Sequence, residues 1–366
     1  MFVKNIFYNA VFLALGTHIV YDVIGSRRPR PPTSMYRNIL IIKPGAVGDL
    51  IQMTPVVRAL NKAYPTASIT LLVGSASTAS LFHHHPGVRE AIVYERSNRH
   101  RSLPAFLQLW KDLRSRSFDL VLNFQRSNLK AWALVAASFP CRILVYHKAR
   151  KRIIHAVQNY LETLAPLGIP PAGDRLEFFL DAPSRDFAKE ILPSPPSGAP
   201  VIALNPGATH AVNRWPAQRF AELADLIAER IGGQAIIIGG PDDVPLAEQI
   251  IEASRTKPRS FAGKTSLLQL GALLERCSLL VSGDTGPMHL ATAVGTPVIA
   301  LFGAADPDRT GPIGAANRVI AASDVDCVPC RSRSCSNKTY LACMERITPD
   351  RVAGEITQLL RQRPSA

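Results

Sequence analysis

The sequence predicts an α/β protein built from two doubly wound domains, each with a parallel β-sheet. Three observations predict this class: short apolar runs recur along the 366 residues, helical stretches separate them, and a Pro-rich segment interrupts the alternation near the middle. Fully apolar runs of four or five residues are typical of parallel strands that are covered on both faces. The 47% hydrophobic and 19% charged content excludes a disordered chain, and only six cysteines exclude a disulfide scaffold.

The first alternating half begins near residue 38. Its expected strands are residues 39–42, 69–73, 91–94, 120–124 and 143–146, and its expected helices are residues 48–60, 104–114 and 131–138. The repeated order of strand, turn and helix is the pattern of a Rossmann-like domain. We therefore predict an N-terminal domain over residues 35–175.

A break in the pattern follows at residues 193–200, which read Pro-Ser-Pro-Pro-Ser-Gly-Ala-Pro, and we predict a linker region over residues 176–200. The alternation then restarts. The expected strands are residues 201–204, 235–238, 279–281 and 298–302, and the expected helices are residues 217–231 and 267–276. We predict a second Rossmann-like domain over residues 201–348. Thr348 is a suitable N-cap for a last helix within residues 349–366.

The charge is distributed unevenly between the two halves. The net charge is +14, and residues 1–180 hold 23 Lys and Arg against 9 Asp and Glu, whereas residues 181–366 are neutral. This asymmetry favours an anionic partner for the first half, although a basic half can also serve solubility alone.

The first 34 residues are predicted to associate with a membrane. An apolar but interrupted stretch, residues 5–24, is followed by Arg27, Arg28 and Arg30 in a Pro-rich segment. Polar residues within the stretch disfavour a span, so an interfacial helix with arginines at the headgroups fits better. A single weak span, or an ordinary first helix packed on the domain, are the alternatives.

Loops that follow strands carry the candidate chemistry of the first half. Lys43, Gly45, Gly48 and Asp49 follow the first strand, where glycines let the backbone approach a ligand. The loop lacks both the P-loop and the Gly-x-Gly-x-x-Gly patterns. Asp49 is either a general base at the floor of a cleft or a helix-dipole cap.

The second half offers three comparable loops. Thr209, His210 and Arg214 precede a helix and form a candidate phosphate site. Asp242 follows the next strand, where an acid can bind ribose hydroxyls or cap a helix. The most specific loop follows a third strand and leads into a helix; its candidate residues are Asp284, Thr285, Gly286 and His289.

Four ordered segments carry a resemblance to a known family. They are KPGAVGDLIQMTPVVRAL, NPGATHAVNRWPAQRFAELA, GDTGPMHLATAVGTPVIALFGAADPDRTGP and CVPCRSRSCSNKTYLACMERITPDRV. In this order they resemble glycosyltransferase family 9, the heptosyltransferases of the lipopolysaccharide inner core, over roughly residues 37–360. The resemblance implies the GT-B architecture, an acceptor-binding first domain, a donor-binding second domain, and a last helix that packs back towards the first domain.

The resemblance also implies roles for individual residues. Asp49 matches the proposed general base, which would deprotonate the acceptor hydroxyl as it displaces ADP from ADP-heptose with inversion. The segment from Asp284 to His289 matches the donor-binding motif, Thr209 a phosphate-contacting hydroxyl, and Asp242 an acid that holds the ribose. Metal ions are not implied for catalysis, because helix N-termini and basic side chains can stabilise the diphosphate.

One position departs from the family pattern. The family commonly has Lys immediately before the Arg/His-Trp-Pro unit, and this chain has Asn213 there. Arg214 or His210 could supply the missing positive charge. Alternatively, the enzyme could use a different nucleotide-sugar as donor or a different surface glycan as acceptor. A third possibility is a catalytically weakened, membrane-associated protein that binds glycans.

Four cysteines near the C-terminus form a separate candidate site. Cys327, Cys330, Cys335 and Cys343 have the spacing C-x₂-C-x₄-C-x₇-C, which is compatible with structural zinc, with disulfides or with free thiols.

The predicted partners are an ADP-sugar and an anionic glycolipid, bound at the cytoplasmic face of the bacterial inner membrane. Two basic runs in the first half suit such an acceptor, and a solvated face is their alternative. The runs are Arg96, Arg99, His100, Arg101, Lys111, Arg114 and Arg116, and Lys148, Arg150, Lys151 and Arg152. No motif indicates nucleic acid.

Overall fold

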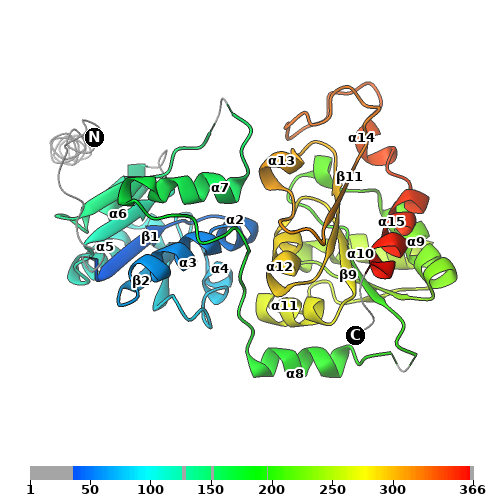
Figure 1. Cartoon of the computed structure of the whole chain (residues 1–366), viewed down its shortest axis with the longest axis horizontal. Helices are drawn as coiled ribbons and strands as arrows, with labels where there is room; N and C mark the ends of the chain where they lie inside the picture. Colours follow the sequence, from blue (N-terminus) through cyan, green and yellow to red (C-terminus); the bar gives the residue numbers. More distant parts are fainter. Residues whose placement is uncertain (1–35, 126–128, 150–151, 196, 363–366) are drawn as a thin grey trace.

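The structure is a computed structural model that describes residues 36–125, 129–149, 152–195 and 197–362. It consists of two α/β domains that lie side by side (Figure 1). The N-terminal domain has a parallel sheet of five strands in the order β3-β2-β1-β4-β5. These strands are β1 (Asn38–Ile42), β2 (Ser68–Val73), β3 (Glu90–Val93), β4 (Leu120–Asn123) and β5 (Arg142–Val145). All five predicted strands are confirmed.

Both faces of this sheet are buried, which explains the unbroken apolar runs. Ile39 and Ile41 of β1 belong to one hydrophobic cluster, whereas Leu40 and Ile42 belong to another. The first face is covered by α3 (Thr54–Ala63) and α7 (Ala156–Leu161), and the second by α5 (Leu103–Ser115) and α6 (Leu129–Ala136). Two further short α-helices of this domain are α2 (Val47–Ile51) and α4 (Ala76–Ser80).

The predicted continuous helix over residues 48–60 was wrong. It is divided into α2 and α3, with a turn at Gln52 and Met53 between them. Pro55 stands in the first turn of α3. Proline cannot donate an intrahelical hydrogen bond and its ring clashes with the preceding turn, so it favours a helix start over a helix interior.

The C-terminal domain has a parallel sheet of six strands in the order β11-β10-β9-β6-β7-β8. The strands are β6 (Val201–Asn205), β7 (Gln234–Ile237), β8 (Arg259–Ser260), β9 (Leu279–Ser282), β10 (Val298–Phe302) and β11 (Arg318–Ala321). Its helices are α9 (Ala217–Leu226), extended by η4 (Ile227–Ile231), α10 (Val244–Ala253), α11 (Leu267–Glu275), α12 (Gly286–Val294), α13 (Pro307–Thr310), α14 (Ala342–Glu345) and α15 (Pro349–Arg361). The two Rossmann-like domains predicted from the sequence are thus present.

The segment expected to be a linker, residues 176–200, contains the helix α8 (Ala182–Ile191). Asp181 caps this helix by accepting a hydrogen bond from the Ser184 amide, and α8 packs on α11 of the second domain. The Arg185 guanidinium forms an ion pair with Glu275 of α11, with an N–O distance of 2.8 Å. The chain therefore crosses between the domains before α8, and this helix belongs with the C-terminal domain.

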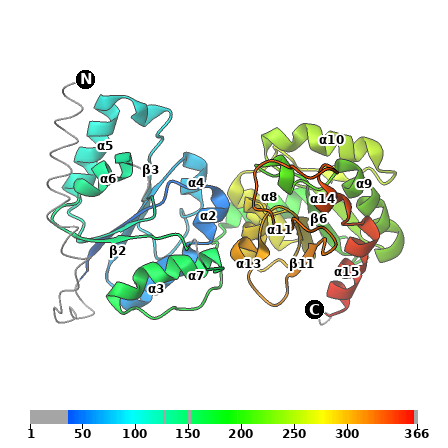
Figure 2. The ribbon, with the colours of Figure 1, turned by 90° about the horizontal axis from the view of Figure 1, so that it is seen from above.

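The position of α15 differs from the expectation that the last helix packs back towards the first domain. It packs on α9, η4 and β10 of its own domain, on the side remote from the N-terminal domain (Figures 1 and 2). Its apolar face, which includes Val352 and Ile356, is buried in the same cluster as Trp215. The Trp215 indole donates a hydrogen bond to the Ile347 carbonyl, which ties the start of the helix to this core.

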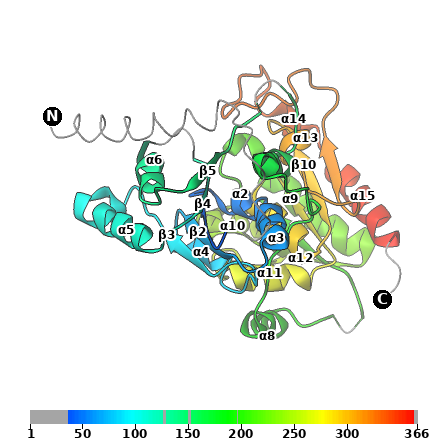
Figure 3. The same cartoon turned by 60° about the vertical axis from the view of Figure 1, so that its left-hand side comes forward.

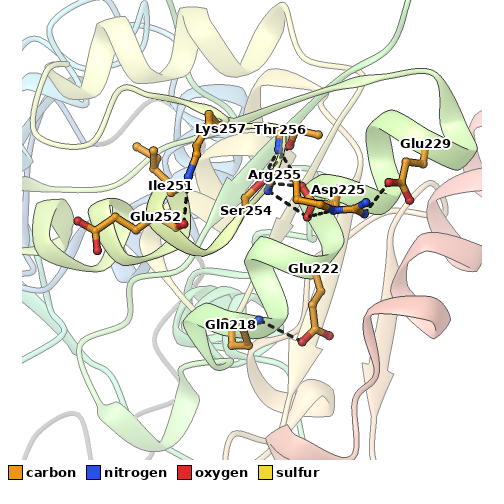
Figure 4. A network of polar contacts seen from close by, with 10 residues as sticks. All are labelled: Gln218, Glu222, Asp225, Glu229, Ile251, Glu252, Ser254, Arg255, Thr256 and Lys257. Atoms are coloured by element: carbon orange, nitrogen blue, oxygen red, sulfur yellow. Dashed lines mark hydrogen bonds and ion pairs between the residues drawn. The ribbon is translucent and has the colours of Figure 1, made fainter.

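A buried carboxylate stabilises the C-terminal domain far from the domain boundary. Asp225 accepts hydrogen bonds from the Ser254 hydroxyl at 2.7 Å and from the Thr256 amide at 3.0 Å (Figure 4). Burial alone would raise the pKa of Asp225, but the hydrogen bonds from Ser254, Thr256 and Arg255 outweigh burial and lower it to about 2. The network joins α9 to the turn after α10.

The two domains meet through short elements at the carboxyl ends of their central strands. α2 packs on α12 and α4 packs on α11. In Figure 2, α2 lies between the two sheets, and Figure 3 shows the molecule with the N-terminal domain turned forward. In the described part of the chain, no helix is both long and apolar enough to cross a bilayer. Residues 1–34, for which the sequence predicts membrane association, lie outside the described residues.

Candidate active site

Asp49 lies at the domain boundary and is joined to two buried side chains. It is in the first turn of α2, directly after the β1 loop, and its side chain is 43% exposed. The Tyr160 hydroxyl donates a hydrogen bond to Oδ1 of Asp49 at 2.9 Å. The Lys43 ammonium lies 3.1 Å from the Tyr160 hydroxyl and 3.5 Å from the same carboxylate oxygen. The half-exposed Asp49 carboxylate is therefore positioned by the Tyr160 hydroxyl and the Lys43 ammonium group.

Burial controls the ionisation of both supporting groups. It lowers the pKa of Lys43, and the nearby charge of Asp49 opposes that shift. Burial also raises the pKa of Tyr160, and the charge of Asp49 adds to that rise, so Tyr160 keeps its proton. Gly45 allows the loop to close over these groups, because a Cβ there would lie 3.2 Å from Asp49 Oδ2 and from Lys43 Cε.

The start of α12, in the second domain, packs on the start of α2: a Cβ on Gly48 would lie 3.4 Å from the Gly286 Cα. Thr285 is the N-cap residue, but its hydroxyl does not cap the helix. The Asn205 side-chain amide, at the end of β6, donates to the hydroxyls of Ser282 at 2.9 Å and Thr285 at 3.0 Å. The first turn of α12 thus has no side-chain cap. Its amides other than that of Pro287, which has no hydrogen, are candidates for binding an anion.

Asp284 lies beside this helix start and is held in an environment that disfavours its charge. Its carboxylate accepts a hydrogen bond from the Thr310 hydroxyl at 3.1 Å. Burial raises the pKa of Asp284 to about 6, and the charge of Asp49 from the other domain contributes to the rise. A carboxylate destabilised in the free protein is suited to accept hydrogen bonds from a ligand's hydroxyl groups.

His289 is buried at the contact between the domains. Its ring lies within hydrogen-bonding distance of the Gln52 side-chain amide, with an Nε2–Nε2 distance of 3.2 Å. Burial lowers the pKa of His289 to about 4, so the ring is neutral at physiological pH. A Cβ on Gly48 would lie only 2.8 Å from the ring. The structure therefore gives this residue an interdomain contact, whereas the sequence predicted a donor-binding role.

A second set of hydrogen bonds joins the two domains. The Arg309 guanidinium, in α13, donates to the carbonyls of Ala149 and Arg152 in the first domain, both at 3.3 Å. The His155 Nε2 atom lies 3.0 Å from the Gly311 carbonyl oxygen. These contacts, like the α2–α12 contact, join loops of the first domain to the second domain.

The remaining predicted donor residues lie on loops of the second domain. Thr209 and Arg214 are exposed, and His210 precedes the single turn η3 (Ala211–Asn213). Arg214 donates its Nε–H to the Ala208 carbonyl at 3.0 Å, and no other hydrogen bond from its guanidinium is present within the described residues. Its terminal nitrogens are therefore available for an anion. The Asn213 carbonyl packs against Gly283, where a Cβ would lie 2.6 Å away.

The two neighbouring acids after β7 differ in position. Asp242, the residue chosen from the sequence, is exposed. Asp243 instead accepts a hydrogen bond from the Gly240 amide at 2.8 Å, and its carboxylate occupies the space that a Cβ on Gly207 would need. Asp243 is thus the acid directed towards the loop that follows β6.

The structure places Lys43 and Gly45 beside Asp49, and Gly48 beside Gly286 and His289 of α12. Sequence reasoning missed four contributors to this arrangement, which are Gln52, Tyr160, Asn205 and Thr310. None of them stands in a Gly-rich turn. Asn205 does end a strand, which is a signal that could have singled it out.

Part of the first basic run has structural roles. Arg114 donates to the Phe139 carbonyl and Arg116 to Glu90, while the buried His100 ring accepts from the Glu95 amide at 3.1 Å. Arg96, Arg99, Arg101 and Lys111 remain exposed.

The four cysteines lie near one another and are all free. Cys327, Cys330 and Cys335 line a small cavity with Val212 and Ala304. Within the described residues, no group of three or more His, Cys, Asp or Glu side chains is arranged to hold a metal ion. The structure gives no support to the structural zinc that the spacing allowed.

The fold is a two-domain arrangement of the GT-B type, and the candidate site lies where the two Rossmann-like domains meet. The family model for "Glycosyltransferase family 9 (heptosyltransferase)" matches residues 106–341. The chain belongs to this family and is a glycosyltransferase.

Solved structures and relatives agree with that assignment. A family 9 glycosyltransferase from Veillonella parvula superimposes with a TM-score of 0.78 at 26% identity, covering 90% of this chain and 98% of that chain. The Escherichia coli ADP-heptose lipopolysaccharide heptosyltransferase II gives 0.71 at 26% identity, covering 89% and 99%. The lipopolysaccharide core heptosyltransferase OpsX of Haemophilus influenzae is 26% identical, over 79% of this chain and 85% of that protein.

Proposed function

We propose that this protein transfers a heptose from ADP-heptose to the inner core of lipopolysaccharide, with Asp49 as general base. The observation that carries the proposal is the half-exposed Asp49 carboxylate, which accepts a hydrogen bond from Tyr160 and belongs to α2, the helix that packs on the uncapped start of α12. The family assignment supports a glycosyl donor, and relatives named as lipopolysaccharide heptosyltransferases support this donor and acceptor.

The chemistry is a single displacement. The acceptor hydroxyl gives its proton to Asp49 while its oxygen bonds to the anomeric carbon, and the bond from that carbon to the diphosphate breaks as ADP leaves. Attack from the face opposite the leaving group inverts the anomeric centre. General base catalysis of this kind typically contributes about 10²–10⁴-fold to the rate.

Hydrogen-bond donors of the second domain, among them one guanidinium, would stabilise the departing diphosphate. The candidates are the amides at the start of α12, the Thr209 hydroxyl, His210 and the free terminal nitrogens of Arg214. Helix N-termini and cations placed where charge develops lower the barrier, so this proposal requires no metal ion. Asp284 would hold donor sugar hydroxyls, and Asp242 or its neighbour Asp243 would hold the ribose.

The experiment uses purified protein with ADP-heptose and a lipopolysaccharide core acceptor that lacks the heptose. We expect ADP release, an acceptor mass gain of one heptose, and an inverted anomeric configuration by NMR. ADP-glucose and UDP-sugars serve as competing donors. Turnover with another nucleotide-sugar instead would favour the alternative donor that Asn213 suggests. Binding of the acceptor without turnover by any donor would favour the weakened glycan-binding protein.

We also propose contact with the cytoplasmic face of the inner membrane. Outside residues 1–34, the exposed side of α5 supports it: Leu103 is 68% exposed, Leu107 one turn later is 38% exposed, and Lys111 follows on the same side. Exposed Arg99 and Arg101 stand just before this helix. Apolar residues flanked by cations are typical of helices that lie on anionic bilayers.

Co-sedimentation with vesicles that contain anionic phospholipid tests this contact. Deleting residues 1–34 should weaken binding, and Leu103→Asp with Leu107→Asp should weaken it further. Tyr340→Asp, which alters a side chain 64% exposed in the second domain, is the matched control and should change nothing. Equal binding by all variants would contradict the proposed contact.

A further inference from the structure

Three side chains of the first domain, one of them the proposed base Asp49, meet at the domain boundary. Lys43 comes from the β1 loop, Asp49 from α2 and Tyr160 from α7, more than a hundred residues later. We infer that Lys43 and Tyr160 form a one-directional hydrogen-bond relay that positions Asp49, with Tyr160 as a positioning residue for proton abstraction. This inference rests on the proposed function, because it assigns a partner to the proposed base.

The chemistry of the three groups fixes the direction of the relay. An ammonium group has only donors, so at the 3.1 Å contact Lys43 donates and the Tyr160 oxygen accepts. The only hydrogen of the phenol is then free for Asp49, and the 2.9 Å contact to Oδ1 matches a hydrogen bond to a carboxylate. The Lys43 ammonium also lies 4.9 Å from the Tyr160 ring centroid, which restrains the phenol further.

The relay leaves one carboxylate oxygen for the substrate. Both supporting groups approach Oδ1. Within the described residues no hydrogen bond reaches Oδ2, which lies over Gly45, where no side chain intervenes. The acceptor hydroxyl would therefore meet Oδ2, which takes the proton, while Tyr160 and Lys43 keep theirs throughout the reaction.

Tyr160 is itself held by packing and by the domain contact. It is only 4% exposed, and its ring makes edge-to-face contacts with Phe124 and Tyr146 at 5.5 and 5.2 Å between centroids. Its helix, α7, is capped by the Nδ1 atom of His155, which accepts from the Val157 amide. Since Nδ1 accepts, Nε2 of the neutral ring carries the hydrogen and donates to the Gly311 carbonyl of the second domain. Docking of the second domain thus fixes the helix that presents Tyr160.

The test compares Tyr160→Phe with a matched control, Tyr146→Phe. Both substitutions remove one hydroxyl from the same aromatic cluster, but the Tyr146 hydroxyl donates to the Asn159 side chain and not to Asp49. Steady-state kinetics with ADP-heptose and core acceptor are measured from pH 5 to 9 for both variants, for Lys43→Met and for the wild-type protein, with thermal unfolding as a folding check.

We expect Tyr160→Phe to lower kcat about ten-fold and to change both KM values by less than about two-fold, because the base loses its orientation but substrate contacts remain. A carboxylate that loses a hydrogen bond to its charged form holds its proton more tightly, so the acid limb of the kcat profile should move up by about one pH unit. Lys43→Met should move the limb in the same direction, and Tyr146→Phe should not move it.

A folded Tyr160→Phe variant with unchanged kcat and an unchanged acid limb of the pH profile would overturn the relay. The relay would also be wrong if Tyr146→Phe moved the acid limb as far as Tyr160→Phe does. Failure of the proposed function looks different. In that case the wild-type protein shows no turnover with ADP-heptose and the core acceptor at any pH.

Discussion

Asp284→Asn should make the protein more stable at neutral and alkaline pH while it abolishes most of the activity. Burial raises the pKa of Asp284 from 3.8 to about 6. The folded protein therefore binds this proton more strongly than the unfolded chain does. The stabilising contribution is fully present below about pH 3.8 and is lost as the pH rises through 6. Asparagine keeps an oxygen for the Thr310 hydroxyl but carries no charge at any pH.

The size of the pKa shift of Asp284 determines the expected change in the free energy of unfolding. At about 1.4 kcal/mol per pH unit, ionising Asp284 in the folded state costs up to about 3 kcal/mol above pH 6. The variant avoids this cost, which corresponds to a rise in Tm of roughly 5–10 °C for a domain of this size. A functional carboxylate kept at the expense of stability is a common trade-off in enzymes.

Thermal unfolding of Asp284→Asn and the wild-type protein at pH 8 and pH 4 provides the assay. The variant should have the higher Tm at pH 8, and the difference should nearly vanish at pH 4. Asp308→Asn, which alters an exposed acid on the nearby α13, is the control and should show no such difference. A variant Tm equal to or below the wild-type value at pH 8 would refute the reasoning about burial.

Three further predictions concern the domain contact, the Asp225 network and the departure from the family pattern. Gly48→Ala places a Cβ 2.8 Å from the His289 ring, so kcat/KM should fall at least about ten-fold while the circular dichroism spectrum is retained. Asp225→Asn removes a carboxylate with a pKa of about 2, so the free energy of unfolding measured with urea at pH 7 should fall by about 2 kcal/mol. This difference from the wild-type protein should shrink as the pH falls from about 4 to 2. Asn213→Lys should raise kcat with ADP-heptose about ten-fold, whereas Lys at the exposed Ala211 of the same turn should not.

The central strands were predictable because burial on both faces demands an unbroken apolar run, as in Ile39–Ile42. The edge strands β8 and β11 of the second domain could not be predicted from the sequence. β8 has only two residues, and in β11 Val319 is 44% exposed while Arg318 is polar, so neither carries the apolar signal. Edge strands of this kind are recognised by their pairing, which depends on residues distant in sequence.

The site was predictable where chemistry follows a strand and a glycine-containing turn, as with Asp49 and Asp284. Tyr160 escaped notice because an aromatic residue on a helix normally indicates core packing, and its contact with Asp49 spans 111 positions. The adjacent acids Asp242 and Asp243 are equivalent in sequence, and only the turn η5 (Pro241–Asp243) distinguishes their directions. The partner of His289 was hidden for a similar reason, since Gln52 belongs to the other domain.

Asp49 is the proposed base that abstracts the proton of the acceptor hydroxyl. The most direct measurement is the rate of ADP release from ADP-heptose with the core acceptor by the wild-type protein and by Asp49→Asn, together with calorimetric binding of ADP. We predict a rate lower by about 10²–10⁴-fold and an ADP affinity within about two-fold of the wild-type value. An Asp49→Asn variant that turns over at nearly the wild-type rate would contradict the claim.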